Sequence, residues 1–415
     1  MMRLVWSLFL VAVVSLSISC GESLECNAEN NCHFIEGEVA CKEGYRWVDP
    51  DSADDFRCEK VPRVDIPVLG KGAHTLDAVN LRVIGSASDG LNMPRDVGVH
   101  PTIPGNLWVV NRGDTSMSVF FDAGTPSQSS IKKEAYYAGG QHFMAEPAAL
   151  AFADNGNFAT IHETDDLTQG PVSQGGTPRD FMGPTMWSSD LNIFNAGHAG
   201  HLDMMHNSPL GMGIAWERDN IYWVFDGYHS SITRYDFGHD HGPGGAYHDD
   251  GIVSRYVEGQ VKRTPNVVSH LEFDPASRLL YVADTGNQRV AVLATESGTR
   301  GQDLPWGEIY DCFQHPGQAV TCADYHSMDG ALFQTLVYGP DHGITQPSGL
   351  ALHGDFIYVS DFATGTISAF NKDGLIMDWL ETGRAQSLGG IEFDAEGNLY
   401  IADTGANELL LISPL

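Results

Sequence analysis

The stretch YVADTGNQRVAVL occupies residues 281–293, and YIADTGANELLLI occupies residues 400–412. Each contains an apolar segment, the tetrapeptide Ala-Asp-Thr-Gly and a second apolar segment. Apolar segments separated by a short polar turn are typical of two antiparallel strands. The same pattern at two distant places in one chain indicates an internal repeat.

Comparison outward from these stretches finds six copies of one unit, which has an apolar strand, a tight turn, a second strand ending near an Asp, and a third strand. The copies begin at Met93, Glu146, Ser208, Val268, Gln346 and Ser387. Turns such as ADNGN at 153–157 and DAEGN at 394–398 carry the Asp, Asn and Gly residues that tight hairpins require. We expect the longer gaps at 164–207, 238–264 and 298–344 to hold loops.

A single meander of three or four strands is marginally stable because both of its faces are exposed. Six meanders arranged radially bury those faces on each other, so the sequence predicts an all-β fold, a six-bladed β-propeller over residues 74–415. The last copy ends after its third strand, one strand short of a blade. The segment HTLDAVNLRVIG at 74–85 precedes the first copy and has strand character. We expect this segment to complete the last blade and close the ring.

The N-terminus has the features of an export signal. Arg3 precedes an apolar stretch, Leu4–Ile18, that is short for a membrane span, so residues 1–19 are predicted to be a signal peptide. Cys20 follows small residues, and this segment resembles a bacterial lipoprotein signal. The resemblance implies a lipid anchor on Cys20 and a place at the bacterial outer membrane or cell surface. Ser17 stands where such signals usually have Leu, and ordinary secretion is the alternative.

The cysteines also indicate export, because those that remain after Cys20 form an even set of six. They are Cys26, Cys32, Cys41, Cys58, Cys312 and Cys322. Residues 20–60 are too few to bury a core and are predicted to hold two disulfides, whose pairing the sequence leaves open. The segment CKEGYRW at 41–47 resembles part of an EGF-like module. A linker over 61–73 would follow, and a separate disulfide is predicted to join Cys312 to Cys322.

The composition excludes some classes of partner. The chain has 23 Lys and Arg residues against 54 Asp and Glu, a formal net charge of -31, which repels phosphate backbones. Nucleic acid is therefore not an expected partner. The sequence contains no Gly-rich phosphate loop, no GxSxG segment and no HExxH segment.

Two segments identify a repeat family. The segment TQPSGLAL at 345–352, with Asp361 after it, and YVADTGNQRV at 281–290 resemble the NHL repeat. In that repeat Pro-x-Gly-apolar-Ala is followed by apolar-Ala-Asp-x-x-Asn-x-Arg. The resemblance covers about residues 74–415 and implies an NHL-type propeller.

Two copies depart from the ordinary repeat and point to a narrower group. They contain NRGDTS at 111–116 and DGYHSS at 226–231. These segments resemble the propeller of peptidyl-α-hydroxyglycine α-amidating lyase, in which the Arg of an RGD segment and the Tyr of a DGY segment face the active site. The resemblance implies catalytic roles for Arg112 and Tyr228. It also implies that Arg112, with Arg289, binds the substrate.

The zinc ligands of that lyase are not matched here. The family places His residues at the starts of several inner strands, where this sequence has Arg95, Ala148 and Ser348. Only His270 lies nearby, one position away from the family pattern. A core histidine is the alternative interpretation of His270.

Histidines are nevertheless concentrated in one region, since seven of the 17 lie at 198–248. We predict metal ligands among the residues His162, His201, His206, His229 and His270. Imidazole nitrogens suit Zn, Cu or Fe, Asp203 offers a carboxylate, and Ca is a further candidate. His239 and His241 lie in a loop rich in Gly and Asp, and we expect both to be solvated.

Three hypotheses about function follow. The first is an exported NHL-repeat propeller lipoprotein that binds a small-molecule, peptide or protein ligand at one face and carries a His-based metal site. The second is a metal-dependent lyase in which metal-bound water and Tyr228 act on a substrate held by Arg112. The third is a non-catalytic scaffold for surface contacts. Bound metal separates the first two from the third.

Overall fold

The computed structural model describes four short strands near the N-terminus and, from residue 64 on, most of the chain. The ranges described there are 64–134, 143–165, 182–194, 200–245, 247–304 and 311–415. The chain forms two compact units, Met1–Arg63 and Val64–Leu415. Within the described residues, no helix has both the length and the apolar character needed to span a membrane.

The first unit contains two antiparallel hairpins. They are β1 (Cys32–Ile35) with β2 (Glu38–Cys41), and β3 (Tyr45–Val48) with β4 (Arg57–Lys60). The predicted signal peptide, Cys20 and Cys26 lie outside the described residues, as do the side chains of Cys32, Cys41 and Cys58. The lipid anchor and the two N-terminal disulfides therefore stay predictions.

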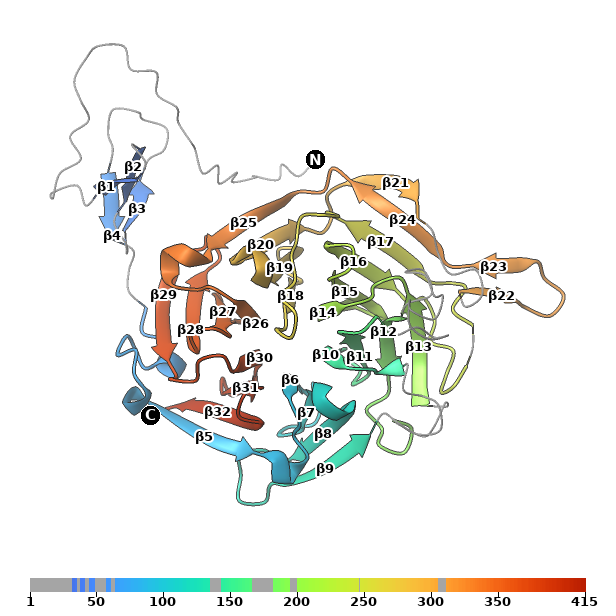
Figure 1. Cartoon of the computed structure of the whole chain (residues 1–415), viewed down its shortest axis with the longest axis horizontal. Helices are drawn as coiled ribbons and strands as arrows, with labels where there is room; N and C mark the ends of the chain where they lie inside the picture. The colour runs from blue at the N-terminus through green and yellow to red at the C-terminus, as the bar shows by residue number, and fades with distance from the viewer. Residues whose placement is uncertain are drawn as a thin grey trace, which may run out of the picture. The chain divides into compact units, whose positions relative to one another are not determined.

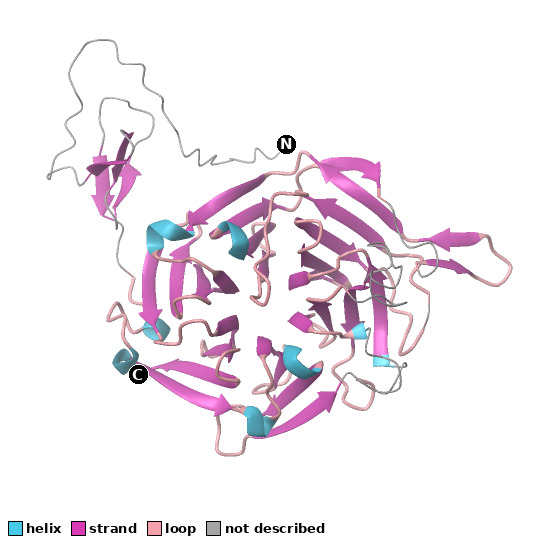
Figure 2. Cartoon of the chain, in the orientation of Figure 1, coloured by secondary structure: helices cyan, strands magenta, loops and turns pink. Residues whose placement is uncertain are grey.

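The second unit is a six-bladed β-propeller, as the repeat predicts (Figures 1 and 2). Blade 1 consists of β6 (Pro94–Val99), β7 (Leu107–Asn111), β8 (Ser116–Phe121) and β9 (Ser129–Glu134). Blade 2 consists of β10 (Pro147–Phe152), β11 (Phe158–His162), β12 (Met182–Trp187) and β13 (His201–His206). Blade 3 consists of β14 (Gly211–Arg218), β15 (Ile221–Asp226), β16 (Ser231–Asp236) and β17 (Ile252–Tyr256), with two added strands.

The remaining blades follow the same order. Blade 4 consists of β18 (Leu271–Asp274), β19 (Leu279–Asp284), β20 (Arg289–Ala294) and β25 (Phe333–Tyr338). Blade 5 consists of β26 (Pro347–His353), β27 (Phe356–Asp361), β28 (Thr366–Asn371) and β29 (Ile376–Glu381). Blade 6 consists of β30 (Leu388–Phe393), β31 (Leu399–Asp403), β32 (Glu408–Pro414) and β5 (Val79–Gly85).

Blade 6 closes the ring as expected, because β5 pairs antiparallel with β32. Leu410 and Ile412 of β32 are fully buried in a core cluster that also takes in Leu69. Leu69 belongs to the short helix η1 (Pro67–Leu69), so the chain joins the core before the first strand of the propeller. Closure thus rests on hydrogen bonds and on apolar burial.

The long gaps between repeats hold outer strands as well as loops. The gap at 164–207 supplies β12 and β13, and the gap at 238–264 supplies β17. The gap at 298–344 supplies β21 (Thr299–Asp303) and β24 (Asp324–Asp329), which extend blade 3, before β25 returns to blade 4. The hairpin of β22 (Cys312–Gln314) and β23 (Val320–Cys322) projects from this segment of the chain (Figure 1).

Strand direction defines the two faces of the propeller. Neighbouring strands of the regular blades are antiparallel, so the end of each second strand and the start of each first strand lie on one face, which we call the mouth face. The loops that join first to second strands and third to fourth strands lie on the other face, the rear face. The sites described below are assigned to the mouth face or the rear face by this rule.

Candidate functional site

Three histidines gather on the rear face between blades 2 and 3, and we call them the rear-face cluster: His201, His241 and His248. His201 is the first residue of β13. His241 and His248 come from the loop at 237–251, which joins β16 to β17. The His241 N–H donates to the Leu202 carbonyl at 3.1 Å, and the Gly244 N–H donates to the His201 carbonyl at 2.9 Å. The loop of blade 3 is thereby fastened along β13 of blade 2.

The geometry of the rear-face cluster suits a small cation. One ring nitrogen from each histidine lies within 4.8 Å of the others. His201 and His248 are buried, and His241 is half-buried. A side chain at Gly245 would come within 2.4 Å of His241 Nδ1, so only Gly leaves room for this imidazole. Among the described residues, this is the one such group of His, Cys and carboxylate side chains.

Hydrogen bonds at Nδ1 leave Nε2 available on two of the rings. Nδ1 of His248 lies 2.7 Å from Oδ1 of Asp203, and Nδ1 of His241 lies 2.7 Å from the Gly242 carbonyl oxygen. A carboxylate or carbonyl oxygen accepts a hydrogen bond from Nδ1–H, which leaves the lone pair on Nε2. Nε2 of His241 is buried and has no hydrogen-bond partner. His241, and His248 when Asp203 is ionised, therefore have the tautomer that a metal ligand needs.

Burial also keeps these imidazoles neutral. Desolvation lowers the pKa of His248 to about 4 and lowers the pKa of His241. Desolvation raises the pKa of the Asp203 carboxyl to about 8, and Oδ2 of this carboxyl is buried without a hydrogen-bond partner. A bound cation would favour the ionised carboxylate and compensate for its burial.

The rear-face cluster overlaps only in part with the histidines that the sequence suggested as metal ligands. His201 belongs to the cluster as predicted, His248 was not among the predicted ligands, and His241 was expected to be solvated. The segment GHDHGPGGAYHDD at 238–250 carries both His241 and His248. A repeat pattern places this segment in a loop but does not show that the loop lies against β13.

Two of the other predicted ligands are occupied by different partners. His162 is buried at the end of β11, with Nε2 3.1 Å from the Thr160 hydroxyl. Desolvation lowers the pKa of His162 to about 3, against a smaller opposing contribution from the Gly183 backbone. Nδ1 of His206 lies 2.7 Å from Oδ1 of Asp311, and both side chains are fully buried.

His229 and His270 are each paired with a carboxylate. Nδ1 of His229 lies 2.7 Å from Oδ2 of Asp226 on the mouth face. His270 of blade 4 lies 3.3 Å from Asp96 of blade 1, so this pair spans the propeller axis between opposite blades. Burial opposes the charge on His270, but Asp96 outweighs it and raises the pKa of His270 to about 10. The other nitrogen, Nδ1, lies 2.7 Å from the Leu350 carbonyl oxygen. A protonated His270 with both nitrogens donating has no lone pair for a metal.

A polar cavity of about 330 Å³ opens on the mouth face, and we call it the mouth pocket. The chain segments after β7 and β11 and the segments before β10, β14 and β18 contribute to it. Its lining residues are Arg112, Glu146, Glu163, Thr164, Asp165, Leu210, Arg263, Pro265 and Asn266.

Glu163 is the carboxylate that contacts the arginines at this pocket. It is buried, and its carboxylate accepts from Arg112 Nε at 3.2 Å, from Arg263 Nη1 at 3.2 Å and from the Asn266 N–H at 2.7 Å. Buried Arg95 lies 3.6 Å from the same carboxylate. Desolvation lowers the pKa of Arg95 to about 10, so this guanidinium stays charged at neutral pH. The carboxylate of Glu163 thus joins two cations of blade 1 to one from the segment before blade 4.

The three residues predicted from the lyase resemblance lie on the mouth face. Arg112 lines the mouth pocket and also binds Glu146 at 2.7 Å. Tyr228 is 45% exposed, and its ring contacts that of His229. Arg289 is not part of the pocket lining, and its Nε lies 2.8 Å from Asp284.

Asp361, which ends the second strand of its repeat, has a structural role. Asp361 accepts hydrogen bonds from the backbone N–H groups of Thr345, Gln346 and Ala363. Such bonds satisfy donors that the strand ends would leave unpaired.

No protein-family model and no curated protein matches this chain. Solved structures resemble it at low identity. An auxiliary nutrient binding protein from Bacteroides thetaiotaomicron is 9% identical, with 77% of this chain and 68% of that chain covered and a TM-score of 0.46. Virginiamycin B lyase from Staphylococcus aureus is 11% identical, with 81% and 100% covered and a TM-score of 0.47. A chain of the nidogen/laminin complex is 12% identical, with 72% and 84% covered and a TM-score of 0.45. Likeness at this level assigns no function.

Proposed function

We propose that this chain is an exported metal-binding β-propeller that holds one transition-metal ion at the rear-face cluster. The observation that carries the proposal is the approach of three imidazole nitrogens to within 4.8 Å of one another in a largely buried site. Three imidazole nitrogen donors suit Zn²⁺, Cu²⁺ or Fe²⁺. They do not suit Ca²⁺, which takes oxygen ligands.

Asp203 supports this proposal as an orienting group. Its carboxylate fixes the tautomer and ring position of His248, as carboxylates commonly do for histidines that bind zinc. The predicted signal peptide and the even set of six cysteines after Cys20 support an exported and lipid-anchored protein.

The test is metal analysis of the purified full chain after dialysis against a mild chelator. We expect about one equivalent of a transition metal per chain, lost in His201→Ala and in His248→Ala. The matched control is His239→Ala, because the His239 side chain is 98% exposed in the same loop. Absence of metal from the unaltered chain, or full retention in His248→Ala, would overturn the proposal.

The lyase hypothesis gains no support from this site. It needs a metal-bound water, Tyr228 and Arg112 to act on one substrate. Tyr228 and Arg112 lie on the mouth face, whereas the rear-face cluster lies at the far end of β13. The six residues of that strand span roughly 17 Å at about 3.3 Å per residue.

A second candidate function is binding of a small charged ligand in the mouth pocket. The pocket offers guanidinium groups from Arg112 and Arg263 and carboxylates from Glu146 and Asp165. This mixture suits a ligand with both an anionic and a cationic group. Isothermal titration calorimetry of the full chain with free amino acids tests this function. If no amino acid binds, or if Arg263→Ala leaves the binding unchanged, the function is excluded.

A further inference from the structure

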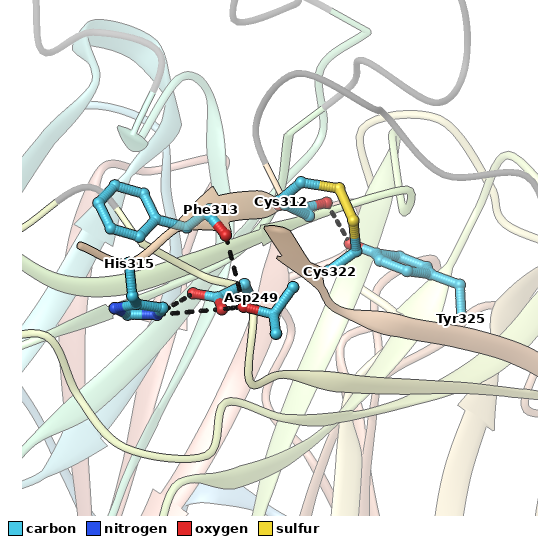
Figure 3. Close-up of a disulfide and its surroundings, with 8 residues drawn as sticks. Asp249, Cys312, Phe313, His315, Cys322 and Tyr325 are labelled. Carbon is cyan, nitrogen blue, oxygen red and sulfur yellow. Dashed lines mark hydrogen bonds and ion pairs between the residues drawn. A yellow bond between two sulfur atoms is a disulfide. The ribbon is translucent and has the colours of Figure 1, made fainter. Parts of the chain in front are cut away.

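The hairpin of β22 and β23 lies against the loop that carries His241 and His248. The disulfide joins Cys312 to Cys322 across the register pair at the base of this hairpin, as the sequence predicts (Figure 3). Each strand has only three residues, and a two-stranded hairpin of this length is marginally stable alone. The disulfide therefore helps to hold the hairpin in one conformation.

Asp249, which follows His248 directly, is held by the hairpin. His315 Nε2 lies 3.2 Å from Oδ2 of Asp249 (Figure 3). The Thr321 hydroxyl donates to the same carboxylate. The Asp249 side chain is 8% exposed, so it is enclosed by these contacts rather than solvated.

Tyr247, which precedes His248, is held from the same side. Its ring lies 5.0 Å from the ring of Phe313 and 5.8 Å from that of His315. The centroid of the Tyr247 ring also lies 5.9 Å from that of the His241 imidazole. Both neighbours of His248 along the chain are thus fixed by residues of the hairpin, and one of them also contacts a second ligand.

The base of the hairpin is tied to the same region. The Ala323 N–H donates to the Asp311 carbonyl at 2.8 Å, and the Asp324 N–H donates to the Gly251 carbonyl at 2.9 Å. Gly251 ends the ligand loop, so the segment that follows the hairpin is hydrogen-bonded to the end of that loop. Cys322 is exposed and Cys312 is half-buried, which leaves the disulfide open to a reductant in solution.

We propose that the Cys312–Cys322 disulfide controls the metal affinity of the rear-face cluster, so that reduction by a dithiol releases the ligand loop and weakens metal binding. This inference rests on the proposed function. A thiolate of the dithiol attacks one cysteine sulfur, and the other cysteine leaves as a thiolate and takes a proton. The second thiol of the reductant then displaces the first cysteine. Two electrons and two protons pass to the protein, which gains two thiols, while the dithiol becomes a disulfide.

The physical reason is loss of preorganisation. The three imidazoles bind one ion well only if the loop at 237–251 holds two of them against β13. Without the hairpin contacts, binding must also order the loop, and the affinity falls by that cost. Changes in groups that position metal ligands typically weaken binding 10-fold to 100-fold.

The experiment measures Zn²⁺ affinity of the full chain by competition with a chromophoric chelator. One sample is untreated, and another is reduced with a dithiol, alkylated with iodoacetamide and desalted, so that the reductant does not bind zinc itself. The double variant Cys312→Ser/Cys322→Ser separates this disulfide from the N-terminal cysteines. We expect the affinity to fall about 10-fold or more in the treated sample and in the variant, with no further fall when the variant is treated.

A second variant removes the contact and keeps the disulfide. Asp249→Asn weakens the ion pair to His315 and leaves both cysteines in place. We expect the zinc affinity to fall in this variant too, with an unchanged circular dichroism spectrum. Zinc affinities within about twofold in the untreated chain, the double variant and Asp249→Asn would overturn this inference and leave the metal site intact. Failure of the untreated chain to bind zinc, copper or iron would instead overturn the proposed function, and this inference with it.

Discussion

Oδ1 of Asp203 lies 2.7 Å from Nδ1 of His248, and both side chains are buried between blades 2 and 3. Asp203 belongs to β13 and His248 to the loop before β17, so the contact crosses from one blade to the next. A buried carboxylate with a raised pKa is costly to retain in a core. The presence of this carboxylate in the core is explained if it positions the His248 imidazole for a cation.

Replacing this carboxylate should weaken metal binding without removing a ligand. We expect Asp203→Asn to lower the zinc affinity about 10-fold to 100-fold, because the amide no longer fixes the tautomer of His248. Competition with a chelator measures the change. The control is Asp240→Asn, an exposed carboxylate near His241, and an equal loss in both variants would contradict the positioning role of Asp203.

The ion pairs of Glu163 should be important for stability. In Glu163→Gln the buried Arg95 loses its carboxylate, and we expect the free energy of unfolding to fall by about 3 kcal/mol or more. Glu146→Gln breaks a contact of Arg112 to a carboxylate that is 46% exposed, and should cost less than about 1 kcal/mol. Urea unfolding measures both. Similar losses in the two variants would show that burial of Glu163 is not the cause.

Stability should fall in acid because of His162. Its folded-state pKa of about 3 is below the unfolded value, so the unfolded chain takes up a proton first as the pH falls. This contribution is absent above about pH 6.5 and grows by up to about 1.4 kcal/mol per pH unit down to about pH 3. Urea unfolding of the chain and of His162→Gln between about pH 7 and pH 4 tests it. Parallel pH profiles would exclude His162 as the source.

Ring closure should be sensitive to the core of blade 6. Leu410 is fully buried between β31 and β5, and Leu410→Ala should lower the free energy of unfolding by about 2–5 kcal/mol. Leu415 is 77% exposed, so Leu415→Ala should change it by no more than about 0.5 kcal/mol. Thermal unfolding followed by circular dichroism compares the two, and equal midpoints would contradict the packing described for β32.

The fold could be predicted because it depends on local patterns. The repeat around Ala-Asp-Thr-Gly specifies strands, turns and the Asp that binds backbone N–H groups, and six such units leave few alternatives to a propeller. The missing strand could also be inferred, since β32 needs a partner and 74–85 is the available segment. The outer strands in the long gaps were missed because they do not share the repeat pattern.

The candidate site could be predicted only in part, because it forms between blades. His201 stood out by composition, yet its partnership with His241 depends on a loop lying along β13, which no local pattern encodes. His206 looked equally suitable in the sequence. It is excluded from the cluster because it lies at the opposite end of the same strand and binds Asp311.

The pairing of β5 with β32 has a consequence for how the protein is made. Asn80 and Ser413, which are hydrogen-bonded, are 333 residues apart in sequence. At a synthesis rate of about 5–20 residues per second, β5 waits on the order of tens of seconds before its partner exists. During that time it is an unpaired edge that other strands can join. The propeller is therefore most vulnerable to aggregation as a nascent chain, and an export route that delays folding until β32 has crossed would protect it.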